Sequence, residues 1–404
     1  MLISKRSRYA RNPIEEEDAL ASILAEKGRK IIKLNRGDPP VYFPTPEYII
    51  KAYIAALREK RTTYTSAFGI EELRSAVSKR YKSMYNIDSG SDDVIVVQGV
   101  TEALKFINSA LIDESDNAVI FKPYYPLYLP DLLIYGGKPV FGKYEEEKEW
   151  SIDIDRLESA LRRTAKKPKY MLITNPNNPT GSVLGRSTLE RIVEIANEYD
   201  IVLISDEIYD EIVYNGAKFT SIGQVAKGMP HVILNGASKD FDATGFRLGF
   251  MLIPGDDSVS KTLKSTFARY AQARLSPNAP AQYALAEGIN NAREHQRSIK
   301  RMVGEIEKRV NLTTKIINES EYMSAVNPKG AFYVFPKVNL DMLKIKNDKE
   351  FVDKLLYEER VQLTRGSGFG EQGHIRIVAL PPKNILEYAL NKINDFCRRN
   401  SKEA

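Results

Sequence analysis

The stretch that decides the fold runs from Val232 to Phe250 and reads Val-Ile-Leu-Asn-Gly-Ala-Ser-Lys-Asp-Phe-Asp-Ala-Thr-Gly-Phe-Arg-Leu-Gly-Phe. Two apolar runs are joined by a small polar turn that carries Lys239 and, further along, Arg247. Burial at a strand end lowers the pKa of a lysine and makes its amine a nucleophile toward aldehydes. A nearby guanidinium offers a planar fork for a phosphate. The pair indicates a Schiff base to a phosphorylated aldehyde; two surface cations in an ordinary loop are the alternative.

Short, continuously apolar runs lie on both sides of this stretch, with helical segments between them. Strands of this kind are covered on both faces, and their alternation with helices predicts a mostly parallel sheet. The expected strands span 94–97, 118–121, 170–173, 201–204, 232–234 and 248–253, and the expected helices span 71–82, 101–111 and 189–199. The pattern changes after about residue 285, where a long helical stretch at roughly 281–318 leads into further strand and helix.

The length of the chain predicts two domains, because 404 residues exceed what one simple core accommodates. The expected fold class is α/β, with a mostly parallel central sheet in a large domain that spans 47–285. A smaller α+β domain is expected from residues 1–46, which read as irregular, together with residues 286–404.

The composition argues against several other classes of protein. The single cysteine, Cys397, excludes an internal disulfide framework and a cysteine-based zinc cluster. With three histidines, a histidine-based metal site is not expected either. Neither a signal segment nor a run of about 18 uncharged apolar residues is present, so we expect a cytoplasmic protein without membrane contact. The net charge of +6 permits a nucleic-acid partner, but 53 acidic residues are interleaved with the basic ones, and the basic cluster at 162–169 reads as a solvated connection.

Three further strand ends carry polar residues, and open parallel sheets bind ligands beyond the carboxyl ends of their strands. Gly99 joins a strand to a helix that holds Thr101 in its first turn, which predicts an anion site or a routine helix cap. Residues 174–181, Thr-Asn-Pro-Asn-Asn-Pro-Thr-Gly, form a rigid amide-rich loop suited to a ring oxygen or a carboxylate. Asp206 ends an apolar strand and needs a partner such as a cationic ring nitrogen, or caps a helix; Tyr209 lies within reach of the same ligand.

One motif points elsewhere and is rejected. Gly368–Gly373 matches the pattern G-x-G-x-x-G, but the dinucleotide fingerprint requires a helix after it. The residues that follow, 374–380, predict a strand instead. NAD binding is therefore not expected.

Taken in chain order, these segments resemble the aspartate aminotransferase-like (class I/II) pyridoxal phosphate enzymes of fold type I. The combination of Asn-Pro-Asn-Asn-Pro-Thr-Gly at 175–181, Ser-Asp-Glu-Ile-Tyr at 205–209 and Ser-Lys with Gly-Phe-Arg-Leu-Gly at 238–249 is highly specific. The resemblance runs from about residue 34 to Arg376 and beyond. Within the family, the segments at 276–282 and 365–370 look most like archaeal alanine aminotransferases.

The resemblance implies a role for each matching residue. Lys239 matches the Schiff-base lysine for pyridoxal 5'-phosphate, and Asp206 matches the partner of the pyridinium nitrogen. The other matches contact the ring hydroxyl (Tyr209 and Asn178), the ring face (Tyr125), the phosphate (Val100, Thr101, Ser238 and Arg247, with Tyr64 from a neighbouring subunit) and the substrate α-carboxylate (Gly37, Asn178 and Arg376). Lys239, Asp206 and Tyr209 are the catalytic candidates.

Two positions depart from the family pattern. Gly236 replaces a hydroxyl residue that is common in the family, which predicts that one phosphate hydrogen bond is missing or supplied elsewhere. Arg36, which precedes Gly37, stands where an apolar residue is usual. The role of Arg36 is open, because it could contact the substrate or lie on the surface.

The resemblance implies transfer of an amino group from an L-amino acid, with alanine expected, to a 2-oxo acid, with 2-oxoglutarate expected, by a ping-pong mechanism. The alternatives are an aspartate, aromatic or broad-specificity aminotransferase, or a lyase that uses the same cofactor. A non-catalytic regulator on this fold would not require both Lys239 and Arg376. The family also implies a homodimer with shared active sites, with small-molecule substrates and no nucleic-acid or membrane partner.

Overall fold

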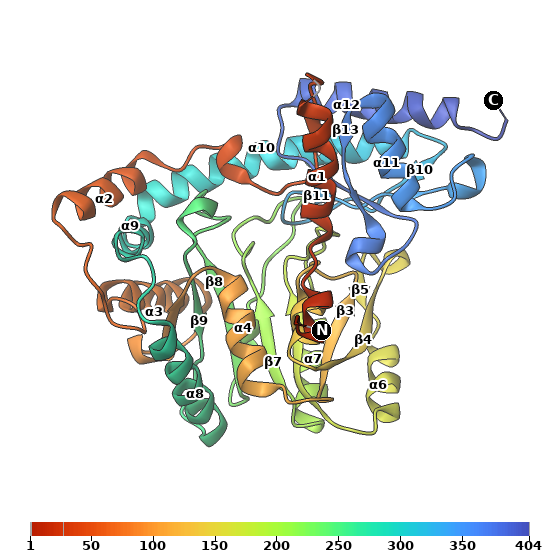
Figure 1. The fold of residues 1–404 in the computed structure, drawn as a ribbon. Coiled ribbons are helices and arrows are strands. Elements are labelled where there is room, and N and C mark those ends of the chain that lie inside the picture. The colour runs from red at the N-terminus through yellow and green to blue at the C-terminus, as the bar shows by residue number, and fades with distance from the viewer. Residues whose placement is uncertain (1, 27, 404) are drawn as a thin grey trace.

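The computed structural model describes residues 2–26 and 28–403, and it is built around one eight-stranded sheet (Figure 1). The strands of this sheet are β2 (Val94–Val97), β3 (Asn117–Lys122), β4 (Lys138–Glu145), β5 (Ser151–Ile152), β6 (Pro168–Thr174), β7 (Val202–Asp206), β8 (His231–Gly236) and β9 (Gly249–Leu252). Their order is β2-β9-β8-β7-β6-β3-β4-β5. The five strands from β8 to β4 run parallel, whereas β9 is antiparallel to both of its neighbours. The predicted α/β class with a mostly parallel central sheet is confirmed.

Helices cover both faces of the sheet, because successive residues of each strand point to opposite sides. One layer consists of α3 (Glu71–Tyr85), α6 (Ile154–Arg163), α7 (Arg186–Glu198) and α9 (Ala279–Asn290), and the other of α4 (Val100–Leu111), α5 (Tyr128–Ile134) and α8 (Ser258–Arg274). In β2, Val94 and Val96 join the core under the first layer, and Ile95 and Val97 join the core under the second. The all-apolar strands are therefore explained by burial on both sides.

A second hydrophobic core lies beside the sheet and is built mainly from the C-terminal third of the chain (Figure 1). Its helices are α10 (Ala292–Asn318), α11 (Asp348–Glu359) and α12 (Lys383–Arg399). Its small sheets pair β1 (Ile32–Lys33) with β13 (Val361–Gln362), β10 (Met323–Ser324) with β12 (Lys337–Val338), and β11 (Tyr333–Val334) with β15 (Ile375–Val378) and β14 (Thr364–Arg365). The division into domains at residues 46 and 285 stays a prediction.

The N-terminal segment differs from expectation. Residues 1–46 read as irregular, but Pro13–Glu26 form helix α1, which precedes α2 (Glu47–Arg58). Strong helix formers fill α1, and Glu15 and Glu16 lie in its first turn, where they favour the positive end of the helix dipole. Leu24 packs with Leu356 of α11. The prediction was wrong because the Arg residues before α1 and the Pro residues at 39–46 are typical of loops.

The expected helical stretch at 281–318 is two helices. Helix α9 ends at Asn290, and the side chain of Asn291 accepts a hydrogen bond from the backbone N–H of Glu294 at the start of α10. The strand expected after the G-x-G-x-x-G match is confirmed as β15, so the rejected motif lacks the helix that a dinucleotide needs. Among residues 2–26 and 28–403, no helix combines the length and apolar character that a bilayer crossing requires.

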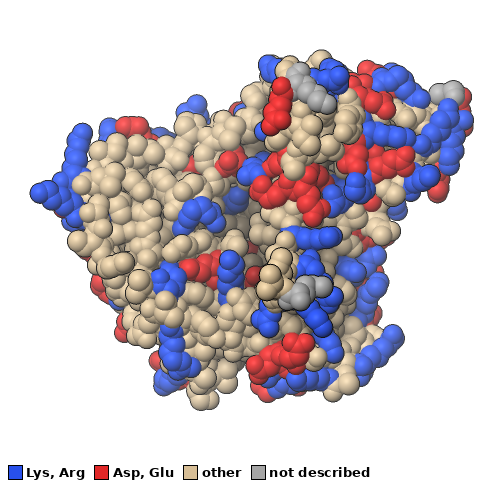
Figure 2. Space-filling model, in the orientation of Figure 1, with Lys and Arg blue, Asp and Glu red and all other residues tan. Residues whose placement is uncertain are grey.

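Acidic and basic side chains are intermixed over the right-hand part of the visible face, whereas the upper left carries few charged side chains (Figure 2). The basic cluster at 162–169 lies at the connection between α6 and β6, as expected. Within it, Lys166 contacts Asp116 and Lys167 contacts Asp200. These lysines are paired with acidic groups of the same chain.

Candidate active site

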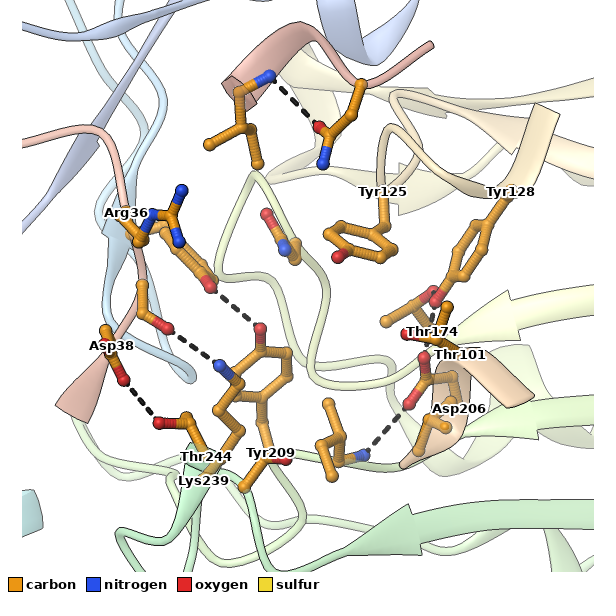
Figure 3. A pocket seen from close by; sticks show the side chains of 18 of the residues that line it. Arg36, Asp38, Thr101, Tyr125, Tyr128, Thr174, Asp206, Tyr209, Lys239 and Thr244 are labelled. Atoms are coloured by element: carbon orange, nitrogen blue, oxygen red, sulfur yellow. Dashed lines mark hydrogen bonds between the residues drawn. The ribbon is translucent and has the colours of Figure 1, made fainter. Parts of the chain in front are cut away.

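A cavity of about 490 Å³ lies where the carboxyl ends of β6 and β7 and the turn after β8 meet β15 and residues 36–38 (Figure 3). All but one of the predicted site residues line this cavity, although they come from distant parts of the chain. These residues are Gly37, Val100, Thr101, Tyr125, Asn178, Asp206, Tyr209, Ser238, Lys239, Arg247 and Arg376. Only Tyr64 lies elsewhere.

Lys239 extends into the cavity from the turn after β8, and its Nζ donates a hydrogen bond to the carbonyl of Gly37 at 2.7 Å (Figure 3). Part of its side chain remains open to the cavity. The surrounding protein nevertheless displaces enough water to lower the pKa of Lys239 to about 8, an effect that the carboxylate of Asp38 opposes. An amine with this pKa is partly neutral near neutral pH and is therefore a competent nucleophile and base.

Asp206 ends β7 with only 5% of its surface exposed. The hydroxyl of Tyr128 donates to its carboxylate at 2.7 Å, and the backbone N–H of Ile208 donates at 3.3 Å. Burial raises the pKa of Asp206 to about 6, and these two hydrogen bonds limit the rise. The carboxylate is thus mostly ionised at neutral pH while buried, which suits it to pair with a cationic ring nitrogen.

The amide-rich loop at 174–181 divides its three asparagines between structure and cavity. The side-chain oxygen of Asn175 accepts from the N–H of Leu184 at 2.9 Å, and that of Asn177 accepts from the N–H of Thr180 at 3.1 Å. These two residues fix the loop. Asn178 faces the cavity, and its Oδ1 accepts from Arg376 at 3.0 Å.

Arg376 is a buried cation, with 1% of its surface exposed. Besides Asn178, its guanidinium donates to the carbonyl of Asn35 and lies 4.7 Å from the ring centroids of both Tyr333 and Phe369. No carboxylate oxygen of residues 2–26 and 28–403 lies within 4.0 Å of it, and its Nε has no protein partner. Glu17 interacts with Arg376 from beyond that distance, but burial raises the pKa of Glu17 to about 8, so this carboxyl group is mostly neutral near neutral pH. Because a buried cation without a contacting anion is costly, this position favours a ligand that brings a carboxylate.

The start of α4 forms a second anion site in the cavity. Gly99, with φ of 76°, precedes the helix, and the N–H groups of Val100 and Thr101 belong to its first turn, which has no intrahelical partners. A Cβ atom at Gly99 would lie 2.6 Å from Nη2 of Arg247, so the absence of a side chain lets the guanidinium approach the helix end. Arg247 donates to the carbonyl of Thr244 at 2.9 Å.

Arg36 also lines the cavity, but it is not a free cation. Its Nη2 lies 2.7 Å from a carboxylate oxygen of Glu15 and 2.5 Å from one of Asp18, both on α1. The hydrogen bond that Arg36 donates to Asp18 is the largest cause of the raised pKa of Arg36. Two carboxylates thus surround one guanidinium, and this wall of the cavity carries no excess of positive charge.

Two positions discussed from the sequence, Gly236 and Tyr64, lie outside the cavity. Gly236 pairs with Gly249 of β9, and a Cβ atom there would lie 2.6 Å from the backbone of Gly249 and Leu248. A hydroxyl side chain at this position would therefore meet the neighbouring strand. Tyr64 is 82% exposed and lines a separate hollow with residues 62–63 and 276–280.

Sequence reasoning missed two tyrosines that hold the site together. Tyr128 bridges two strand ends, since its hydroxyl lies 2.9 Å from that of Thr174 and donates to Asp206. The hydroxyl of Tyr333 lies 2.8 Å from that of Tyr209. The sequence offers only a weak indication of these roles. Both tyrosines stand in apolar segments, and the hydroxyl of a buried tyrosine needs a hydrogen-bond partner.

The chain matches a known family over most of its length. Residues 29–393 match the family model described as aminotransferase class I and II. The chain belongs to the class I and II aminotransferases. Its relatives carry different substrate names.

This aminotransferase is similar to proteins named for alanine and for aspartate. The solved alanine aminotransferase from Pyrococcus furiosus is 38% identical, with a TM-score of 0.93, and the match covers 98% of this chain and 100% of that one. The glutamate-pyruvate aminotransferase AlaA of Haemophilus influenzae is 33% identical over 96% of this chain and 94% of its own length. The aspartate aminotransferase of Bacillus subtilis is 32% identical over 95% of both chains. These relatives do not fix the substrate.

Aminotransferases of this class depend on pyridoxal phosphate and act on small amino and 2-oxo acids. The cavity fits that cofactor in the chemistry of its donors. It offers an amine of lowered pKa for the aldehyde in Lys239, a buried carboxylate for the ring nitrogen in Asp206, and the Gly99 cradle beside Arg247 for the phosphate.

Proposed function

We propose that this aminotransferase moves the amino group of alanine to 2-oxoglutarate in two successive half-reactions in one cavity. The observation that carries the proposal is the buried guanidinium of Arg376, which has no carboxylate partner among the described residues and lies close enough to lower the pKa of Lys239. Every amino and 2-oxo acid brings an α-carboxylate. Arg376, the amide of Asn178 and the backbone of Gly37 are the groups that hold it.

The residues proposed to hold the cofactor are those that the family resemblance implies, and the chemistry of Lys239, Asp206 and the Gly99 cradle beside Arg247 agrees with these roles. Lys239 holds the aldehyde, Asp206 the protonated ring nitrogen, and Tyr209 with Asn178 the ring oxygen. Tyr125 covers the ring face. Ser238, Arg247 and the amides of Val100 and Thr101 hold the phosphate, with Tyr64 reaching it from a second subunit.

Pyridoxal phosphate, when bound, acts as an electron sink for the α-carbon of the amino acid. The protein moves the proton. When the cofactor is bound, the Nζ of Lys239, with a pKa of about 8, would be neutral in a useful fraction of molecules and would take the proton from the α-carbon as general base. As general acid it would then deliver that proton to the carbon of the cofactor's former aldehyde group. Asp206 contributes by keeping its negative charge, which the hydroxyl of Tyr128 stabilises.

The preference for alanine rests on the wall around Arg36. Glu15 and Asp18 pair with this guanidinium, so the second carboxylate of 2-oxoglutarate or glutamate must compete with them for Arg36. A methyl side chain requires no charged partner. Aspartate is the rival donor, because a relative of similar identity is named for it.

We further propose a homodimer in the cytoplasm. An uncharged area lies over α2 and α9 at the left of Figure 2. Exposed apolar side chains occur in α2, at Ile54 and Leu57, and in the segments that follow α2 and precede α9, at Tyr64 and Leu275. Burying these side chains against a second copy would bring Tyr64 to a neighbouring cavity.

A half-reaction screen tests the substrate. The holoenzyme is mixed with single amino acids, and the rate at which the cofactor absorbance changes is compared between alanine, aspartate, glutamate and aromatic amino acids. We expect alanine and glutamate to react fastest. A tenfold preference for aspartate or an aromatic donor would refute alanine while leaving the aminotransferase family intact.

A further inference from the structure

A cluster of ionisable side chains lies behind the cavity and lines no part of it. It contains the little-exposed side chains of Arg80 of α3, Asp210 and Glu211 of the turn after β7, Asp240 of the turn after β8, and His295 of α10. Asp210 directly follows Tyr209, and Asp240 directly follows Lys239. The cluster therefore joins the two segments that carry the central site residues.

Asp210 is surrounded by hydrogen-bond donors. Its carboxylate accepts from the amide of Asn235 at 2.8 Å, from the hydroxyl of Tyr85 at 2.5 Å and from Arg80 at 3.1 Å. Burial alone would raise the pKa of Asp210, but the charge of Arg80 and these hydrogen bonds lower it overall. Asp210 is the ionised member of the cluster.

Asp240 has the opposite surroundings. It is 3% exposed, and both of its carboxyl oxygens are buried without a hydrogen bond from any donor in the described part of the chain. Its side chain lies within hydrogen-bonding reach of Asp210. Two carboxyl groups in such contact form a hydrogen bond only when one of them carries a proton, because two adjacent negative charges repel.

The other groups around Asp240 leave it no cation of its own. Arg80 pairs with both Asp210 and Glu211 at 3.1 Å, and the imidazole of His295 contacts Glu211. Tyr81 and Tyr85 of α3 stay neutral, because burial raises the pKa of both phenols. An ionised Asp240 would thus be a third carboxylate beside one guanidinium and one imidazole.

We propose that Asp240 is a neutral acid that donates its proton in a hydrogen bond to ionised Asp210, and that this pair positions the Lys239 segment against the Tyr209 segment. Burial, followed by the charge of Asp210, raises the pKa of Asp240 well above its usual range, which agrees with the hydrogen-bond pattern. The next residue, Phe241, stacks on His295 with 4.3 Å between ring centroids, so α10 supports the same turn. Asp240 is a positioning residue.

The pH dependence of stability tests the proton on Asp240. Above the ordinary pKa of an aspartate, near 3.9, the unfolded chain releases this proton while the folded protein keeps it. The free energy of unfolding therefore falls as the pH rises toward the pKa of Asp240 in the folded protein. Asp240→Asn removes the titration and keeps a donor, so its advantage over the wild type should grow with pH, by up to about tenfold in the unfolding equilibrium per pH unit.

The measurement is urea unfolding of the holoenzyme across the neutral range, for wild type, Asp240→Asn and Asp210→Asn. Asp210→Asn is the matched control, because it replaces the carboxylate that accepts three hydrogen bonds by a neutral amide. This substitution should lower stability at every pH. The expected result is a gap between Asp240→Asn and wild type that widens with pH. A gap that stays constant, or a destabilised Asp240→Asn, would overturn the neutral acid.

A second measurement tests positioning. The pH at which the cofactor absorbance changes, together with kcat, is compared for Asp240→Asn and Asp240→Ala. Asp240→Asn should match the wild type, whereas Asp240→Ala should shift the absorbance transition and lower kcat about tenfold, equivalent to ~1.4 kcal/mol. Unchanged absorbance in both variants would overturn the positioning role. The absorbance and kcat measurement rests on the proposed function, because it assumes that Lys239 binds the cofactor. The unfolding measurement does not, so failure of the proposed function can be told apart from failure of the neutral Asp240.

Discussion

Tyr128→Phe should weaken cofactor binding at low pH and spare it at high pH. The Tyr128 hydroxyl donates to Asp206 at 2.7 Å, and this bond is stronger when the carboxylate is ionised. A hydrogen bond to a charged group contributes about 1.5–3 kcal/mol, and about 1.4 kcal/mol corresponds to one pH unit. The pKa of Asp206 is about 6 with this hydrogen bond in place. Loss of the hydrogen bond should raise that pKa by about one to two units.

The direction of the pH effect on cofactor affinity is set by the protonation state of Asp206 that binds the cofactor. The ionised form of Asp206 holds a protonated ring nitrogen, so binding falls as the pH drops through the pKa of Asp206. At pH 6 half of the wild-type carboxylate is ionised, against far less in the variant, so affinity should differ by about 5- to 50-fold. The ratio of the two affinities should approach one in alkaline solution, where Asp206 is ionised in both proteins.

The assay is equilibrium binding of pyridoxal phosphate to the apoenzyme over this pH range. The cofactor titrates too, so the ratio of wild-type to variant affinity at each pH is the quantity compared. Asp206→Asn supplies the control, because it has no carboxylate for Tyr128 to stabilise. If Tyr128→Phe has a pH-independent effect, or an equally large effect in the Asp206→Asn background, Tyr128 acts through packing and the electrostatic reasoning is wrong.

Three further outcomes are expected. Borohydride reduction of the holoenzyme followed by peptide mapping should place the cofactor on Lys239, and a modified lysine elsewhere would overturn the site. Mixing inactive Tyr64→Phe and Lys239→Ala proteins should restore part of the activity, because hybrid dimers contain one intact shared site; sedimentation as a fully active monomer would exclude this arrangement. Glu15→Gln should raise kcat/KM for 2-oxoglutarate about two- to fivefold by releasing Arg36, and Arg36→Ala should lower it, with alanine unaffected in both. Equal effects on both substrates would make Arg36 structural.

Much of the site could be predicted because its residues stand at the ends of short apolar strands. Asp206 and Lys239 follow β7 and β8, and the carboxyl ends of parallel strands meet at one edge of a sheet. The roles of Arg376 and Tyr125 came from the family resemblance and not from periodicity. Tyr128 could not be found in this way, since its contact joins α5 to β7 across 78 residues. Side-chain hydrogen bonds at that separation leave no local pattern in the sequence.

Helix α1 shows why substrate preference is harder to predict than the chemistry. The chemistry depends on groups whose charge is set by burial at a strand end, and a strand end is visible in the sequence. The charge of the wall near the substrate depends on whether Arg36 is free. That is decided by Glu15 and Asp18, on a helix whose flanking residues are typical of loops. Because these three residues are partly exposed, their balance can be altered by single substitutions at little cost in stability. We therefore propose that substitutions at these three positions change the substrate preference while Lys239 and Asp206 stay fixed, which agrees with the mixture of substrate names among relatives of similar identity.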